Sequence, residues 1–405
     1  MRKLRIALYT DHYLPVVDGV VNQIINIRKE LESRGHDVYV LAAGDENTLE
    51  IARTDPKLIV FRGIRFADKK STFALDPIAF LRQFLDLPKF DIVHTHSPFI
   101  MGISAAIVAK ITGAKLVSTF HTLFFHEMAM SKYVSYFSKS LSLSRKFIGW
   151  SQKAMMGYLA WYYRKCSYVI APTAFIKNML LRKRVASAEV VNNGLDFGAD
   201  SFAVSKREAR KLLGIGQRER IVLFIGRISR EKNLQILIRA GKLMEKHRIN
   251  VIIAGNGPDM QQCAQLSTEL RTKNVRFAGF VEEKEKRYYY AAADVFCNPS
   301  DFEVQSTVDI EAMAMGTPIL VPKNSSQEEF LCGGSGGESF DINDPSDLCS
   351  KAVRIIKKQK NYSPKSIASR FTIKNTVDNL LKIYARSLSE RAVGVRKSYL
   401  NFSSK

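Results

Sequence analysis

Two glutamates in the second half of the chain lie where a site for a phosphate and a polyol would be expected. Glu303 follows an apolar run that predicts a buried strand, and Glu311 lies eight residues later in a helix expected to end near Gly316. In open α/β sheets, ligands bind at the carboxyl ends of the strands. A helix N-terminus there offers backbone N–H groups to an anion, and carboxylates accept hydrogen bonds from hydroxyls. Residues 300–318 therefore predict such a site.

Basic residues follow the first predicted strand of the same half. Gly226 permits a tight exit from that strand, and Arg227 and Lys232 lie in the loop and early helix behind it. Arginine offers a planar fork to two oxygens, and lysine offers a point charge. Either residue alone would more often pair with a surface carboxylate. Their position on the same rim as Glu303 favours phosphate binding instead.

The first half of the chain carries a weaker signal of the same kind. Gly19 follows the first predicted strand and opens a helix near Val20. A glycine lets the backbone approach a ligand, and the helix N-terminus behind it favours a phosphate. The dinucleotide fingerprint G-x-G-x-x-G is absent.

Short apolar runs alternate with helical periodicity, and these elements would position the residues above. The predicted strands are residues 4–10, 37–43, 58–63, 92–95, 116–121 and 168–172, then 221–225, 250–254, 275–278, 295–298 and 318–321. The alternation predicts an α/β protein with a parallel, doubly wound sheet in each half. The expected domains are residues 1–194 and 195–372, with a hinge in 194–216 and a helix and basic tail, 373–405, packing back on the first domain.

Composition limits the class of protein. A chain of 405 residues that is 46% hydrophobic and 25% charged is typical of two globular domains. The five cysteines form no CxxC pair, which predicts reduced thiols in a cytosolic protein, with neither a disulfide framework nor a zinc site. The apolar run after the basic N-terminus is too short for a signal peptide. No segment has the length of uninterrupted apolar sequence that a membrane span requires, so we expect none.

The net charge of +22 is unevenly distributed. Residues 128–188 contain eleven lysines and arginines, many aromatic residues and no acid. A basic, aromatic surface is attracted to anionic membranes, and nucleic acid is the competing interpretation. We expect membrane contact from Lys139, Arg145, Lys146, Trp150, Lys153, Trp161, Arg164 and Lys165.

A series of motifs covers nearly the whole chain. The second half contains G-R-x-x-x-E-K-N at residues 226–233, A-G-x-G-P at 254–258, F-x-G-F at 277–280 and E-x7-E followed by A-M-A-x-G-T-P at 303–318. The first half contains Y-L-P-x-x-D-G-V-V at 13–21, D-I-V-H-T-H-S at 91–97 and S-T-F-H-T at 118–122. The set resembles the retaining glycosyltransferases of family GT4. The resemblance implies the GT-B fold, in which two Rossmann-like domains with parallel sheets face each other across a cleft.

The resemblance also implies roles for the polar residues of the second half. Arg227 and Lys232 would hold the diphosphate of a nucleotide sugar and stabilise the charge that develops as it leaves. Glu303 would accept hydrogen bonds from the transferred sugar, and Glu311 from the ribose. The donor-binding residues expected from the resemblance are Gly19, Gly226, Arg227, Lys232, Glu303, Gln305, Ser306, Thr307 and Glu311.

In the first half, Gly19 would contact the diphosphate from the opposite domain, and His121 would face the sugar near the reacting carbon. In enzymes of this type the departing phosphate is thought to help deprotonate the acceptor, so no enzymic nucleophile is needed. The sequence has no credible D-x-D metal motif, which fits action without a metal ion, and we expect neither a metal ion nor a cofactor. The expected catalytic residues are His121, Arg227, Lys232 and Glu303.

Residues 304–306 depart from the family pattern. Glycine-phenylalanine-glycine is common after the first glutamate, whereas this chain has Val304, Gln305 and Ser306. Without glycine, a positive φ is costly, so ordinary backbone angles are expected. Gln305 resembles the E-T-Q variant of the diacylglycerol glucosyltransferases, and residues 13–21 resemble their first loop. These features, with the basic segment, point to a lipid acceptor.

The resulting hypothesis is transfer of glucose from UDP-glucose to diacylglycerol or a related lipid, with retention, by a peripheral protein on the cytoplasmic face of a membrane. One alternative is a GDP-mannose-dependent mannosyltransferase acting on an inositol phospholipid or another glycan acceptor. Another is a non-catalytic membrane- or RNA-binding protein on the same scaffold, which would be expected to lack one of Arg227, Lys232, Glu303 and Glu311. A third, an epimerase, lacks a motif for its catalytic acids.

Three other histidines and one acid have weaker functional signals. His94 and His96 alternate along a strand end, so we expect one to point into the core and neither to bind a metal. His126 could line an acceptor site or cap a loop. Glu127 could serve an acceptor, but an ion pair is the more common role for such a residue.

Overall fold

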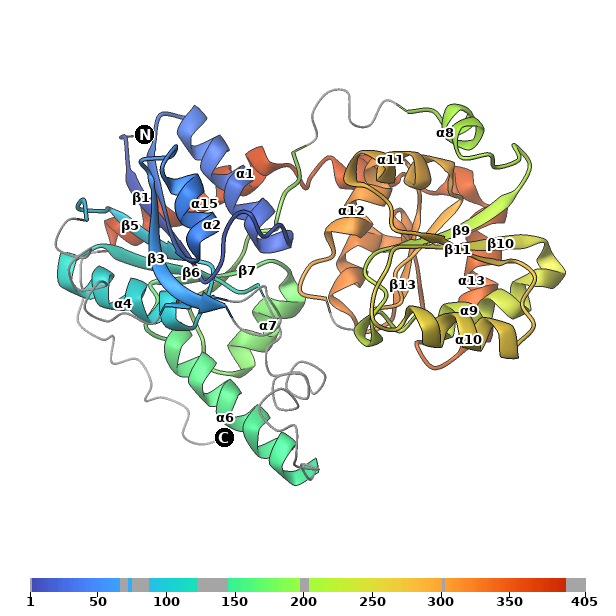
Figure 1. Ribbon diagram of the computed structural model, residues 1–405, viewed down its shortest axis with the longest axis horizontal. Helices are drawn as coiled ribbons and strands as arrows, with labels where there is room; N and C mark the ends of the chain where they lie inside the picture. Colours follow the sequence, from blue (N-terminus) through green and yellow to red (C-terminus); the bar gives the residue numbers. More distant parts are fainter. Residues whose placement is uncertain are drawn as a thin grey trace, which may run out of the picture.

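The computed structural model describes residues 2–65, 72–74, 87–121, 145–196, 204–300 and 303–390. Figure 1 shows two lobes: one is blue to green and also contains one red helix, and the other runs from yellow-green through yellow and orange to red. Each lobe is built on its own sheet, and the two sheets share no strand.

The sheet of the N-terminal domain has the strand order β4-β3-β2-β1-β5-β6-β7-β8. Its strands are β1 (Arg5–Thr10), β2 (Asp37–Gly44), β3 (Leu58–Arg65), β4 (Thr72–Ala74), β5 (Ile92–Thr95), β6 (Lys115–Thr119), β7 (Tyr168–Ala171) and β8 (Ala188–Val190). All neighbours pair in parallel except β4, which runs antiparallel to β3. The order reverses beside β1, whose neighbours are β2 and β5.

Helices cover both faces of this sheet. They are α1 (Gly19–Ser33), α2 (Glu46–Ala52), α4 (Ile100–Thr112), α6 (Arg145–Tyr163), α7 (Ala174–Arg182) and α15 (Ile373–Ser389). Side chains alternate along β1: Ala7 and Tyr9 lie in one core cluster with α4, α6 and α7. Ile6 and Leu8 lie in the other with α1 and α15.

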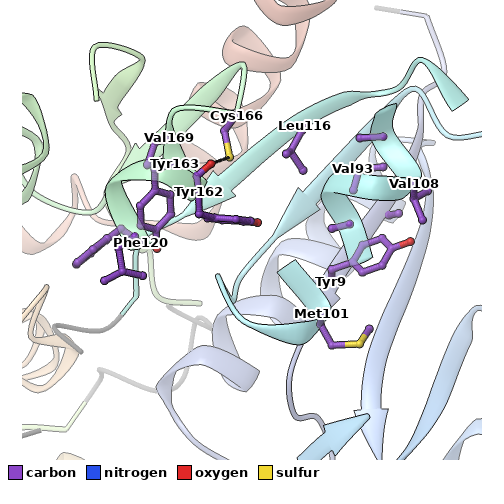
Figure 2. Close-up of a cluster of buried hydrophobic side chains, with 14 of the residues drawn as sticks. Tyr9, Val93, Met101, Val108, Leu116, Phe120, Tyr162, Tyr163, Cys166 and Val169 are labelled. Atoms are coloured by element: carbon purple, nitrogen blue, oxygen red, sulfur yellow. Dashed lines mark hydrogen bonds between the residues drawn. The ribbon is translucent and has the colours of Figure 1, made fainter. Parts of the chain in front are cut away.

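One face of α6 belongs to the core. Figure 2 shows Tyr162 and Tyr163 among Phe120, Leu116 and Val169, and both tyrosines are almost fully buried. The Tyr162 hydroxyl donates a hydrogen bond to a backbone carbonyl of α4 at 3.2 Å. The aromatic segment expected to meet a membrane therefore also anchors a helix to the sheet.

The C-terminal domain has a parallel sheet in the order β11-β10-β9-β12-β13-β14. Its strands are β9 (Arg220–Ile225), β10 (Ile249–Ala254), β11 (Val275–Gly279), β12 (Val295–Cys297), β13 (Ile319–Pro322) and β14 (Gly337–Phe340). Its helices are α8 (Lys206–Leu212), α9 (Leu234–Met244), α10 (Met260–Glu269), α11 (Glu283–Ala292), α12 (Thr307–Ala314), α13 (Pro345–Lys357) and α14 (Pro364–Ala368). Short 3-10 helices include η1 (Arg230–Lys232) and η3 (Ser326–Gly334). Here the order reverses beside β9, between β10 and β12.

The chain passes between the domains at two adjacent places. The Leu195 N–H donates to the Phe371 carbonyl at 2.9 Å, and the Ile373 N–H donates to the Leu195 carbonyl at 3.0 Å. After this crossing, α15 packs on the N-terminal domain, where Val377 and Tyr384 are fully buried. Figure 1 shows this red helix within the blue lobe, beside α1.

The predicted strands are all present, with ends within two residues of the expected ones. Three further strands, β4, β8 and β14, were not predicted. They are only three or four residues long and carry polar or charged residues, as TFA, AEV and GESF, so they lack the continuous apolar run of the predicted strands. The antiparallel β4 also corrects the expectation of a wholly parallel first sheet.

Candidate active site

Lys232 and Glu303 lie together where the strand order of the C-terminal sheet reverses. Lys232 ends η1, which follows β9, and Glu303 follows β12, the neighbouring strand. Their side chains form an ion pair between Nζ and Oε1 and are 22% and 16% exposed. Burial acts to lower the pKa of Lys232, but the Glu303 carboxylate outweighs it and raises that pKa. The amine therefore stays charged.

The loop after β9 lies against the loop after β10. The Gly226 N–H donates to the Ala254 carbonyl and the Ile228 N–H donates to the Asn256 carbonyl, each at 3.0 Å. A Cβ atom on Gly255 would lie 1.8 Å from the Gly226 oxygen. Glycine is therefore required in the A-G-x-G-P motif because two backbones meet there.

Arg227, in the loop after β9, is exposed. Within the described part of the chain, its guanidinium makes no hydrogen bond or ion pair. Burial acts to raise the pKa of Glu231, but its hydrogen bonds and the charges of Lys232 and Arg227 lower that pKa overall. A fork of donors at this position is open to an anion.

The start of α12 is a buried polar cluster. Ser306 is its N-cap, and the Asn298 amide donates to Ser306 Oγ at 2.9 Å and to Asp309 Oδ1 at 3.2 Å. Asp309 is fully buried, and its Oδ2 has no partner among the described residues. Burial, assisted by the charge of Glu303, raises the pKa of Asp309 to about 8. The shift favours the neutral form of Asp309 near pH 7, two residues after the predicted donor-binding residue Thr307.

Glu311 lies on α12, about one helical turn after Thr307. The Tyr290 hydroxyl of α11 donates to Glu311 Oε2 at 2.8 Å. Burial raises the pKa of Glu311, against the nearby charge of Lys286 and the Tyr290 hydrogen bond. One carboxylate oxygen is thereby held by the protein, as a group oriented for a ligand hydroxyl requires.

The amide of Gln305 is occupied by the main chain of Asn193. Gln305 Oε1 accepts from the Asn193 N–H at 2.8 Å, and its Nε2 donates to the Asn193 carbonyl at 2.8 Å. The residue is 8% exposed. Residues 304–306 have no positive φ, as the loss of glycine there predicts.

In the N-terminal domain, His121 lies beside the strands where the order reverses. It follows β6 by two residues, and its Nε2 lies 2.8 Å from His96 Nδ1. Behind it, His94 lies between Thr119 Oγ1 and the Tyr384 hydroxyl, each at 2.7 Å. His94 and His96 are both buried, which corrects the expectation that only one faces the core.

These imidazoles are uncharged near neutral pH. Burial lowers the pKa of His121 to about 4 and that of His94 to about 3, and it lowers the pKa of His96 well below its ordinary range. His121 is half-buried at the edge of this row. It can donate or accept a hydrogen bond without bringing a charge to the site.

Asp11 directly follows β1, and Asp18 lies at the start of α1. Asp18 caps α1, accepting from two backbone N–H groups at 3.0 Å, and its other oxygen lies 2.7 Å from His12 Nε2. Burial acts to raise the pKa of Asp18, but the hydrogen bond and charge of His12 lower it overall. Burial raises the pKa of Asp11 to about 6, and its carboxylate accepts from Ser97 and from the Met101 N–H. Gly19 begins the helix behind Asp18, and a Cβ there would meet no described atom within 4 Å.

Sequence reasoning located Lys232, Glu303, Glu311 and His121 but missed other polar residues of the same loops. Asp11 and His96 lie in or beside motifs that were noted for other reasons. Nothing in the sequence marks Asp309 as buried. Lys139, His126 and Glu127 lie outside the described residues. Within those residues no group of three metal-ligating side chains occurs.

Comparisons with known proteins identify the family. A model of Glycosyltransferase Family 4 matches residues 17–198, and one of the Glycosyl transferases group 1 matches residues 205–375. Alpha-monoglucosyldiacylglycerol synthase of Acholeplasma laidlawii is 30% identical over 84% of this chain and 86% of that protein. A GDP-mannose-dependent alpha-mannosyltransferase of Corynebacterium glutamicum is 24% identical over 90% of this chain and 83% of that protein.

The fold is shared with solved structures. The crystal structure of HepE from Anabaena in complex with UDP and glucose matches with a TM-score of 0.70 at 18% identity, covering 95% of this chain and 100% of that one. The resemblance expected from the motifs is thus confirmed. The chain belongs to glycosyltransferase family 4 and is a glycosyltransferase with the two-domain GT-B fold.

Proposed function

We propose that the protein transfers glucose from UDP-glucose to diacylglycerol or a related membrane lipid, with retention of the anomeric configuration. The observation that carries this proposal is the 30% identity to an alpha-monoglucosyldiacylglycerol synthase over 84% of the chain. A second such synthase, from Streptococcus pneumoniae, is 28% identical over 79% of the chain. The choice of UDP-glucose as donor follows from the resemblance to that subgroup.

The site residues suit this reaction. Lys232 and Arg227 neutralise the diphosphate as the bond between the anomeric carbon and the phosphate oxygen breaks. The acceptor hydroxyl oxygen forms the new bond on the same face of the sugar, and its proton passes to the departing phosphate. Glu303 accepts from the sugar hydroxyls and Glu311 from the ribose. His121, uncharged because of its lowered pKa, hydrogen-bonds near the reacting carbon.

Incubation with radiolabelled UDP-glucose and vesicles containing diacylglycerol should give a labelled glycolipid that α-glucosidase cleaves. The rival donor and acceptor, GDP-mannose and phosphatidylinositol, form the matched arm, because a mannosyltransferase is also among the relatives. If product forms only in that arm, the transferred sugar is mannose and the acceptor is an inositol phospholipid. Two results would contradict the proposed function: no transfer from any nucleotide sugar, and transfer that Glu303→Ala leaves unchanged.

A lipid acceptor places the enzyme at a membrane, and within the described residues no helix could span one. Contact would come from the outer surface of α4, α6 and α7, which contain no acidic residue. Large apolar side chains are exposed there, namely Ile103, Ile107, Ile111, Trp161, Phe175 and Leu181. Exposed basic residues accompany them, namely Lys110, Lys153, Arg164, Lys165 and Arg182. The opposite layer, α1 and α15, carries Glu30, Glu32 and Asp378.

This composition favours an anionic surface. Each basic residue near such a membrane contributes about 1 kcal/mol, and the apolar side chains gain by leaving water. Lys165 Nζ lies 4.6 Å from the Trp161 ring centroid, so charge and aromatic surface are presented together. Arg145, Lys146 and Trp150, also expected at the membrane, lie in the first turns of the same helix, α6. The protein would thus be peripheral, on the cytoplasmic face.

Replacing Ile111 by aspartate should weaken vesicle binding by more than about tenfold, because it removes an apolar contact of ~1.5 kcal/mol, itself worth about tenfold, and adds a repelled charge. Leu212→Asp is the matched control: Leu212 is 67% exposed on α8 of the other domain, and Ile111 is 65% exposed. Co-sedimentation with phosphatidylglycerol and phosphatidylcholine vesicles at rising salt measures the effect. Vesicle binding that does not depend on anionic lipid or salt would exclude this surface as the membrane contact. Equal effects of the two variants would exclude it as well.

A further inference from the structure

The loop that carries Glu303 is held by residues of both domains. On its own side, Ser326 of η3 donates to the Glu303 carbonyl at 2.7 Å, and the Ser300 hydroxyl donates to the Glu231 carbonyl at 3.0 Å. The adjacent residue, Val304, packs against the hydrophobic cluster of the N-terminal domain. Glu303 is thus held by its own domain, whereas the next residue, Val304, contacts the other domain.

Thr173 makes the first polar link across the domains. It is the N-cap of α7 and accepts from the Ile176 N–H at 3.3 Å, while its hydroxyl donates to the Val304 carbonyl at 3.2 Å. Glu329 of η3 accepts from the Ala174 and Phe175 N–H groups at 2.9 and 2.5 Å. The first turn of α7 is therefore capped in part by the other domain, and it also holds the loop.

Gln305 makes the second link. Both polar atoms of its side chain pair with the main chain of Asn193, on the segment that leads from β8 into the linker. Such a pair reproduces the two hydrogen bonds of a β-bridge, using a side chain in place of a strand. Loss of the glutamine amide would leave both the N–H and the carbonyl of Asn193 without this partner, which costs more than the hydrogen bonds themselves contribute.

We propose that Gln305 is a positioning residue, which fastens the loop after Glu303 to the N-terminal domain and so fixes the Glu303 carboxylate relative to the face that carries His121. Its effect reaches the reaction through two peptide units and not through contact with the sugar. This assigns a function to the departure from the family's glycine pattern. The family pattern has phenylalanine at the position of Gln305, and a phenylalanine side chain has no polar atom to pair with the Asn193 main chain, whereas the glutamine amide does.

The inference applies to sugar transfer from any donor, but its kinetic test rests on the proposed function and uses the proposed donor, UDP-glucose. Gln305→Ala should lower kcat roughly tenfold or more, since a misplacement of about 1 Å can reduce rates by ~10²-fold. The donor KM should stay within about twofold, because ground-state binding of the nucleotide is untouched. Gln305→Glu keeps the acceptor for the Asn193 N–H and should give an intermediate kcat.

Amide hydrogen exchange supplies a readout that does not depend on any substrate. The Asn193 amide, which donates to Gln305, should exchange faster in Gln305→Ala, while the melting temperature changes little. Gln262→Ala is the control, because Gln262 is exposed on α10 of the same domain. It should match the wild type in both kcat and exchange.

Thr173→Val and Thr173→Ser provide a second pair should Gln305→Ala fold poorly. Valine removes the donor to the Val304 carbonyl at nearly constant volume and should lower kcat, and serine should restore most of it. A rise in donor KM at unchanged kcat would overturn the proposal and make Gln305 a donor contact. Unchanged exchange at Asn193 would overturn it as well. If the wild type uses neither UDP-glucose nor GDP-mannose, the proposed function fails, and the exchange result alone decides the role of Gln305.

Discussion

Lys232→Ala should reduce sugar transfer by ~10²- to 10³-fold, the usual effect of removing one preorganised group that stabilises developing charge. The partly buried ion pair with Glu303 holds the amine in place before any donor arrives. The raised pKa of Lys232 keeps the amine charged over the whole working pH range. The loss should therefore appear in kcat at every pH between 6 and 9.

The pairing also predicts how two changes combine. Glu303→Ala alone should cause a loss of similar size, because the free amine then lacks its orienting carboxylate. The double variant should lose less than the product of the two single losses, since both act through one interaction. Lys284→Ala is a suitable control, because Lys284 pairs with Glu282 on the surface of the same domain at 77% and 58% exposure. A strictly multiplicative double variant would show that Lys232 and Glu303 act separately.

Asp309→Asn should stabilise the C-terminal domain increasingly as the pH rises. The pKa of Asp309 is raised from 3.8 to about 8, so between these values the folded protein holds a proton that the unfolded chain has released. The free energy of unfolding then falls with rising pH over this window, by at most ~1.4 kcal/mol per pH unit. Asparagine has the same shape and no proton to lose. Its advantage over the wild type should grow by a few kcal/mol between pH 5 and pH 8.

Urea unfolding at pH 5, 6.5 and 8 measures this divergence as a change in the midpoint. The groups facing Asp309 are Glu303 and Lys232, which are charged, and Asn298 and Ser306, which hydrogen-bond to it. Asp259→Asn is the control, because that side chain precedes α10 without capping it. Parallel midpoints for wild type and Asp309→Asn at all three pH values would mean that the buried carboxyl is ionised.

Much of the fold could be predicted from the sequence because parallel strands buried on both faces are nearly continuous apolar runs. The residues after β9 and β12 could be placed on one rim for the same reason, and Lys232 and Glu303 do form a pair there. Strands such as β8 and β14 lack this signal because they are short and carry charged or polar residues. Each pairs with the strand immediately before it in the chain, β7 and β13, at the edge of its sheet.

Contacts between the domains could not be predicted in the same way. Gln305 and Asn193 are 112 residues apart, and nothing local to either indicates the other. The burial of Asp309 likewise depends on how α12 packs on the sheet, because an acid in the first turn of a helix is ordinarily exposed and favourable. Sequence pattern thus located the loops, whereas the partners of their side chains required the tertiary structure.

The placement of α15 affects how the protein can fold while it is being synthesised. Val377, Leu380 and Tyr384 complete the core against β1 and β5, and the Tyr384 hydroxyl reaches His94 across 290 residues of chain. Domains made on the ribosome generally fold in the order of their synthesis. Here the first domain to emerge must wait, with part of its apolar surface uncovered, until the second has been made and α15 has left the exit tunnel.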